Sequence, residues 1–165
     1  MDIKRIMRHL LTTDAQVRKA FPRITLDKIE HAIQASESSH VGEIRFAVDG
    51  ALDGAPLFKG QSARERALDL FAQLRVWDTR HNTGVLIYLL LAERAVEIVA
   101  DRGIHARVDG QEWGAVCQQM EAAFWQSDFE GGAVNGVRAV TKHLVKHFPS
   151  ADPDGNELPD TPVLL

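Results

Sequence analysis

The chain has 165 residues, of which 45% are hydrophobic and 25% charged, and its formal net charge is −4. This is the composition of one ordinary globular domain, and no Lys- or Arg-rich block of the kind that tracks nucleic-acid phosphates is present. The single cysteine excludes an intrachain disulfide and any CxxC metal or redox motif.

The first segment, residues 1–24, is predicted to be a helical extension. Its apolar residues at helical spacing are Ile3, Ile6, Met7, Leu10 and Leu11, and its basic residues on the other side are Lys4, Arg5, Arg8 and His9. Such an amphipathic helix either docks on its own domain or lies on an anionic membrane surface, and docking is the commoner case. A capping box at Thr13 and Gln16 then opens a second short helix, which Pro22 stops.

Neither a signal peptide nor a membrane span is visible in the sequence. The longest apolar run lies within residues 85–92 and is far too short to cross a bilayer. The expected location is therefore the cytoplasm, with a peripheral position at a membrane as the alternative.

The next elements alternate between helix and strand. A helix is predicted over residues 26–38, with Ile29 and Ile33 buried. Residues 42–48 alternate between apolar and polar side chains, which predicts an edge strand with one wetter face. The loop over residues 49–60 is rich in turn formers and long enough to be functional, and a capping box at Ser62 begins another helix.

Residues 85–91 are almost unbroken apolar and predict a central strand that is buried on both faces. The short polar break that follows, and the strand pattern over residues 95–100, predict an antiparallel hairpin. Two helices complete the pattern, one opened by Asp109 and one ending near Phe148. Residues 149–165 hold four prolines and four acids without Lys or Arg, so they are expected to form an extended tail.

Four landmarks around the hairpin follow one another in a fixed order. They are the turn Asn82-Thr83-Gly84, the charged second strand, the residues from Asp101 to Ile104 and the group 128–132 that follows Phe124. In this order and spacing the chain resembles the TPM domain family, many members of which carry Gly-Tyr-Gly-Leu at the third landmark. The family includes a thylakoid acid phosphatase, photosystem II repair proteins and a modulator of acetylcholine receptors, and the match covers about residues 25–147.

This resemblance implies an α/β fold, a three-layer α/β/α sandwich whose small mixed sheet has about four strands. Residues 25–148 would form the domain, between the helical extension 1–24 and the acidic, Pro-rich tail 149–165. Plant members are described as acid phosphatases and some bacterial members as divalent-cation binders, so the resemblance implies a phosphatase activity and a calcium or magnesium cofactor to test. His105 stands where many members carry glutamate, although a hard cation prefers oxygen ligands.

Polar residues gather where the hairpin strands begin and end. The candidate site residues are Asp78, Asn82, Asp101, Arg102 and His105. In an antiparallel hairpin the end of 95–100 lies beside the start of 85–91, so we expect these side chains to form one cluster. Asp49 and Asp53 follow the first strand and are expected at the opposite edge.

If the protein is a hydrolase, the residues of this cluster have two sets of predicted roles. The predicted metal ligands are Asp78, Asn82 and Asp101, and the predicted catalytic residues are Asp101, Arg102 and His105. Arg102 would clamp a phosphate through its guanidinium fork and His105 would act as a general acid. The competing interpretation is an ordinary turn, in which Asp101 and Arg102 form an ion pair and His105 is simply exposed.

Two functions of different class therefore compete. The preferred hypothesis is a binding module whose polar rim, residues 82–105, recognises a protein partner that is membrane-associated or a second copy of the chain. The alternative is a metal-dependent phosphatase that uses the same rim. The sequence has no P-loop, no GxGxxG and no GxSxG, so it supports neither a nucleotide site nor a serine hydrolase.

Overall fold

A four-stranded sheet in the order β3-β2-β1-β4 forms the centre of a computed structural model that describes residues 2–150 and 155–165. The strands are β1 (Glu43–Asp49), β2 (Gly84–Leu90), β3 (Ala95–Ala100) and β4 (Val163–Leu164). β1 pairs in parallel with both β2 and β4, whereas β2 pairs antiparallel with β3. The predicted hairpin and the predicted mixed sheet are therefore confirmed.

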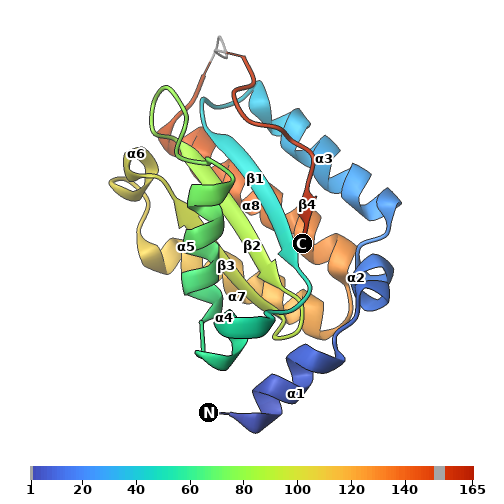
Figure 1. The fold of residues 1–165 in the computed structure, drawn as a ribbon. Helices are drawn as coiled ribbons and strands as arrows, with labels where there is room; N and C mark the ends of the chain where they lie inside the picture. Colours follow the sequence, from blue (N-terminus) through green and yellow to red (C-terminus); the bar gives the residue numbers. More distant parts are fainter. Residues whose placement is uncertain (1, 151–154) are drawn as a thin grey trace.

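Helices cover both faces of this sheet (Figure 1). They are α1 (Ile3–Leu11), α2 (Asp14–Ala20), α3 (Arg23–Glu37), α4 (Gly54–Phe58), α5 (Ala63–Gln73), α6 (Arg102–His105), α7 (Gly110–Trp125) and α8 (Phe129–His147). Successive side chains of β2 point to opposite faces, so Ile87 packs with α3, α7 and α8 and Tyr88 packs with α4 and α5. Both side chains are fully buried, and this is why the strand is apolar without alternation. The fold is the expected α/β/α sandwich.

Three capping boxes fix where helices begin. The side chains of Thr13, Ser62 and Asp109 each accept a hydrogen bond at the N-terminus of α2, α5 and α7, and Gln16, Glu65 and Glu112 respectively bind back to the capping backbone. Each box satisfies backbone N–H groups that a helix end would otherwise leave unpaired. All three boxes were readable from the sequence, so these helix starts are confirmed.

The prediction that β1 is an edge strand is wrong, because β4 pairs beside it. All seven residues of β1 are buried, and its polar side chains bind the returning chain. The Glu43 carboxylate accepts the backbone N–H groups of Glu157 and Leu158 at 3.2 and 3.3 Å. Arg45 donates to the carbonyl oxygens of Pro159 and, at 3.2 Å, Thr161. The polar alternation therefore reflects contacts with the tail rather than exposure to water.

The C-terminal tail is extended, as expected, but it docks on the sheet instead of leaving it (Figure 1). Leu158 and Pro162 are buried along its path. The first part of the predicted acidic segment, residues 151–154, lies outside the described residues. The structure also places a short helix, α4, in the loop 49–60, and another, α6, after β3.

Within residues 2–150 and 155–165, none of the helices has the length and apolar character needed to cross a membrane.

Candidate functional site

The rim at the start of β2 is held together by backbone hydrogen bonds. The N–H of Asp101 donates to the carbonyl of Gly84 at 2.8 Å, and the N–H of Gly103 donates to that of Asn82 at 3.0 Å. Arg102 Nη2 then donates to Asn82 Oδ1 at 3.2 Å. These contacts follow from the hairpin register, in which Val85 pairs with Ala100. The structure therefore brings Asn82, Asp101 and Arg102 together as the sequence predicted.

Two glycines make this close approach sterically feasible. A Cβ on Gly103 would lie 2.5 Å from the Asn82 carbonyl oxygen, and one on Gly84 would lie 1.9 Å from that of Val76. Asn82 itself has a φ of 54°, a left-handed conformation that asparagine tolerates better than most residues. The rim is thus a tightly packed turn that fixes the backbone beside Arg102, whose side chain is exposed.

The other two predicted site residues have different neighbours. Asp78 is exposed and its carboxylate pairs with Arg75 at 2.6 Å. His105 is also exposed and lines a cavity of about 320 Å³ beside β3, together with Glu97 and Cys117. The His105 N–H donates to the Asp101 carbonyl at 2.9 Å, but the side-chain hydrogen bonds of Asn82, Asp101 and Arg102 do not reach the side chains of Asp78 or His105, so the five side chains do not form one hydrogen-bonded cluster.

Burial raises the pKa values of two acidic groups in the cavity beside β3. Desolvation raises the pKa of the Cys117 thiol to about 12, and the nearby Glu97 and Glu121 carboxylates push this pKa in the same direction. Desolvation also raises the pKa of Glu97, although Arg64 opposes this shift. A thiol that stays protonated near neutral pH is a poor nucleophile. Cys117 is therefore a packing residue, partly buried against the core.

The rim offers few of the donors that a hard divalent cation needs. Asp101 Oδ1 accepts the N–H of Arg102 at 2.7 Å, and Asn82 Oδ1 is bound to the guanidinium of the same residue. Of these rim oxygens, only Asp101 Oδ2 is buried without a hydrogen-bond partner. Within the part of the chain that the structure describes, no group of three or more His, Cys, Asp or Glu side chains is placed to hold a metal ion. Calcium and magnesium ions are coordinated by six or more oxygen atoms, so these residues do not fit either ion. The role of Asp78, Asn82 and Asp101 as metal ligands stays a prediction.

At the opposite end of the parallel strands, Asp49 lies where the sequence placed it, apart from the rim. Its carboxylate pairs with Arg66 Nε at 2.8 Å and accepts the hydroxyl of Tyr88 at 3.3 Å. Burial is the main cause that raises the pKa of Tyr88, so this phenol stays protonated. Asp53 is exposed and makes no side-chain cap of α4. Asp49 therefore holds α5 against the sheet.

The docking of α1 rests on contacts that no local sequence pattern indicates. His9 is buried, its Nδ1 accepts the N–H of Leu52 at 2.9 Å, and its Nε2 lies 2.8 Å from Glu93 Oε1. Because Nδ1 accepts a hydrogen bond, the ring proton lies on Nε2 and is donated to Glu93. Arg5 adds bonds of 2.6 Å to Glu93 and to the Gln61 carbonyl. Two of the four basic side chains of α1, Arg5 and His9, thus face the domain, whereas Lys4 and Arg8 are exposed.

The apolar side of α1 consequently faces solvent, where docking would usually bury it. Ile3, Met7, Leu10 and Leu11 are 70%, 55%, 65% and 66% exposed, and only Ile6 packs on the core. Their spacing of i, i+4, i+7 and i+8 places the four on one face of the helix. Docking of α1 is confirmed, but the assumption that its apolar side is the docking side is wrong.

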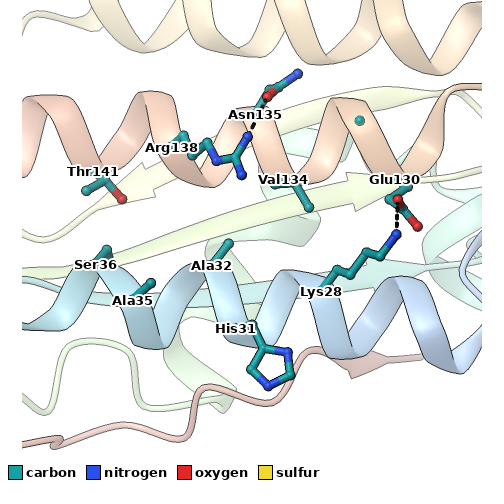
Figure 2. A pocket seen from close by; sticks show the side chains of 11 residues that line it. Lys28, His31, Ala32, Ala35, Ser36, Glu130, Val134, Asn135, Arg138 and Thr141 are labelled. Carbon is teal, nitrogen blue, oxygen red and sulfur yellow. Dashed lines mark hydrogen bonds and ion pairs between the residues drawn. The ribbon is translucent and has the colours of Figure 1, made fainter.

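A groove of about 660 Å³ lies between α3 and α8 (Figure 2). At one end Lys28 Nζ and Glu130 Oε1 are 2.6 Å apart, and Thr25 also donates to Glu130 at 3.2 Å. Arg138 lies further along α8 and contacts Asn135 of the same helix (Figure 2). Because these polar groups already bind one another, the groove is best explained as solvated packing between two helices.

Comparisons with known proteins agree with this architecture. The family model of the TPM domain matches residues 16–143. A comparison with curated proteins finds no match. Among solved structures, the BA42 protein from the psychrophilic bacterium Bizionia argentinensis is 28% identical, with a TM-score of 0.74 over 86% of this chain and 93% of its own.

Two more distant structures share the fold alone. The N-terminal domain of a protein from P. gingivalis is 22% identical, with a TM-score of 0.59 over 76% of this chain and 79% of its own. The N-terminal domain of the cg2496 protein from Corynebacterium glutamicum is 16% identical, with a TM-score of 0.54 over 81% of this chain and 78% of its own. Since the family model matches most of the chain and the expected sandwich is present, this chain belongs to the TPM domain family.

Proposed function

We propose that this chain is a binding module that rests on an anionic membrane surface through α1 and presents its polar rim, residues 82–105, to a membrane-associated protein partner. The cytoplasmic face of a membrane is the location that goes with this proposal. The observation that carries it is the orientation of α1, whose four exposed apolar side chains face away from the domain.

Specific polar contacts maintain this orientation. Arg5 and His9 together make four hydrogen bonds to Glu93, the Gln61 carbonyl and the Leu52 N–H. Rolling the helix to bury its apolar side would leave these part-buried partners without hydrogen bonds, which is costly. An exposed apolar stripe of this kind usually marks an interaction surface.

The charge near α1 favours an anionic surface as the occupant. Residues 2–23 contain six Lys and Arg against two Asp, although the whole chain has a net charge of −4. Lys4 and Arg8 follow the apolar stripe directly around the helix and are exposed. A helix with an apolar stripe bordered by cations lies in the interface of anionic bilayers, where each Lys or Arg contributes about 1 kcal/mol.

The part of the rim that holds Asn82, Asp101 and Arg102 lies at the other end of the parallel strands from α1 (Figure 1). The turn that holds Asn82 and Arg102 precedes β2, whereas the docking contacts of α1 follow β1 and β2. A domain bound to a membrane by α1 would therefore leave this part of the rim accessible to a partner.

Co-sedimentation with vesicles tests the proposal. Wild-type protein is expected to pellet with phosphatidylglycerol-containing vesicles and not with pure phosphatidylcholine. The double variant Met7→Ser/Leu11→Ser should lose this binding without losing stability, because both side chains are exposed. The matched control is Ile24→Ser/Leu68→Ser, which removes two exposed apolar side chains from α3 and α5.

Wild-type protein that stays in the supernatant with anionic vesicles would refute membrane docking. If size-exclusion chromatography then finds a dimer that Met7→Ser/Leu11→Ser dissociates, a second copy of the chain covers α1 instead.

The phosphatase remains the second candidate, favoured by the buried and unpartnered Asp101 Oδ2, which belongs to the residue next to Arg102 in the chain. In that function Arg102 would bind the phosphate and His105 would protonate the leaving group. Asp101→Asn should then abolish hydrolysis of a phosphomonoester while the melting temperature stays the same, since asparagine also caps α6. Wild-type protein without turnover, with and without calcium or magnesium, would exclude this function.

A further inference from the structure

Beside α1, a cleft of about 730 Å³ opens where β2 ends, and its lining brings together cations from three elements. They are Arg8 of α1, Lys19 of α2 and Arg94 of the β2–β3 turn, while Trp125 and Phe129 form an aromatic wall. The cleft has the volume of an ordinary small-molecule site. It also lies at the carboxyl end of the parallel strands, which is where open α/β sheets bind their ligands.

The guanidinium of Arg94 is held in place before any ligand arrives. Its backbone takes a left-handed φ of 51° in the hairpin turn. Its side chain lies 4.9 Å from the ring centre of Trp125 and 5.8 Å from that of Phe129, and Nη1 donates to the Trp125 carbonyl at 3.3 Å. Stacking on aromatic faces orients the guanidinium plane and lowers the entropy lost when its remaining N–H groups bind an anion.

No carboxylate competes for these cations. None of the described residues that line the cleft is acidic, and neither Arg8 nor Lys19 forms an ion pair within the described part of the chain. The nearby Glu93 carboxylate is bound to the docking side of α1, and that of Asp128 accepts the N–H of Gly131. Unpaired like charges in one cleft repel one another, and a bound anion would relieve this repulsion.

We propose that this cleft binds a phosphate-bearing anion, with Arg94 and Arg8 as the guanidinium donors and Lys19 as an ammonium contact. Arginine forks match phosphate geometry with two parallel hydrogen bonds, and a lysine adds a mobile positive charge. This site goes beyond membrane docking and stands without it. The phosphate group belongs either to a lipid headgroup or to a soluble phosphate ester, and the experiment below separates the two sources.

The first arm titrates isotope-labelled, full-length protein with inorganic phosphate and follows the backbone amide signals by NMR. We expect saturable shifts centred on Ala92, Arg94 and Ser127, which line the cleft. Lys19→Gln should weaken binding by about fivefold, the upper range for one partly exposed ion pair. Arg18→Gln is the matched control, because Arg18 is exposed on the same helix but does not line the cleft.

The site is refuted if the shifts do not saturate, if they are scattered over the surface, or if Arg18→Gln weakens binding as much as Lys19→Gln. The last result would mean that phosphate responds only to general positive charge.

The second arm repeats the comparison of Lys19→Gln with Arg18→Gln on phosphatidylglycerol vesicles. Weaker vesicle binding by Lys19→Gln alone identifies a lipid headgroup as the source, whereas unchanged vesicle binding with impaired phosphate binding identifies a soluble ester. Met7→Ser/Leu11→Ser should keep the phosphate-dependent shifts even where it no longer binds vesicles. The failure of membrane docking and the failure of the phosphate site are thus distinguishable.

Discussion

Asp49 illustrates how a single buried carboxylate connects a helix to the sheet. Its side chain is almost completely buried, and it accepts hydrogen bonds from Arg66 of α5 and from Tyr88 of β2. Removing one partner of a buried ion pair leaves the other charge desolvated and uncompensated. The position of Asp49 at a strand end resembles that of a catalytic acid, but its partners give it a structural role.

We therefore predict that Asp49→Ala lowers the free energy of unfolding by about 3 kcal/mol. Asp53→Ala is the control, because Asp53 is exposed and makes no cap hydrogen bond, and it should change stability by less than about 0.5 kcal/mol. Urea denaturation of the two variants measures both values. Equal stabilities would mean that Arg66 finds another partner.

At the scale of elements, the pairing of the C-terminal tail with β1 depends on several carboxyl groups held close together. Burial, together with the nearby Asp160 of the tail and Glu43 of β1, raises the pKa of Glu37 at the end of α3 to about 7. Burial also raises the pKa of Glu43, although the N–H groups of Glu157 and Leu158 oppose this. The tail is thus attached most favourably when Glu37 keeps its proton.

The stability of the protein should follow the ionisation of Glu37. In the unfolded chain this carboxyl has the ordinary glutamate pKa of 4.5, but folding raises its pKa to about 7. The favourable contribution is therefore complete below about pH 4.5 and is lost as the pH rises through about 7.

Glu37→Gln should melt at a higher temperature than wild type above about pH 7, and this difference should vanish towards about pH 4.5. Asp27→Asn changes an exposed carboxylate on the same helix and should show no such trend. A difference in melting temperature that is independent of pH would contradict the raised pKa of Glu37.

At the scale of the whole molecule, charge is distributed unevenly between the two ends of the chain. The N-terminal helices are basic, although the net charge of the chain is −4. A membrane would attract α1 and α2 and repel much of the remaining surface, so electrostatics would orient the domain on it.

Binding to anionic vesicles should therefore weaken as salt is raised from about 0.05 to 0.5 M, because exposed charges are screened over that range. It should not disappear completely, since burial of the α1 apolar side chains does not depend on charge. Co-sedimentation across a salt series measures this. Binding that is insensitive to salt would mean that the cations of α1 and α2 take no part.

Local patterns in the sequence were sufficient for most of the fold and for part of the candidate site. The apolar run of β2, the hairpin after it and the three capping boxes each depend on residues close in sequence, so their structures could be predicted. The meeting of Asn82 with Arg102 followed from the hairpin register. Asp78 and His105 were harder to place because turn geometry, not strand register, sets the direction of their side chains.

Periodicity and capping in the sequence by themselves determined the longer helices and the three longer strands, but not α4, α6 or β4. Only the tertiary structure decided that β4 covers β1 and that α1 docks through Arg5 and His9. Both outcomes depend on buried polar pairs between residues more than 80 positions apart, His9 with Glu93 and Glu43 with Leu158. The hydrophobic pattern of the sequence indicates which side chains are buried, but it does not predict which buried polar groups form hydrogen bonds with each other.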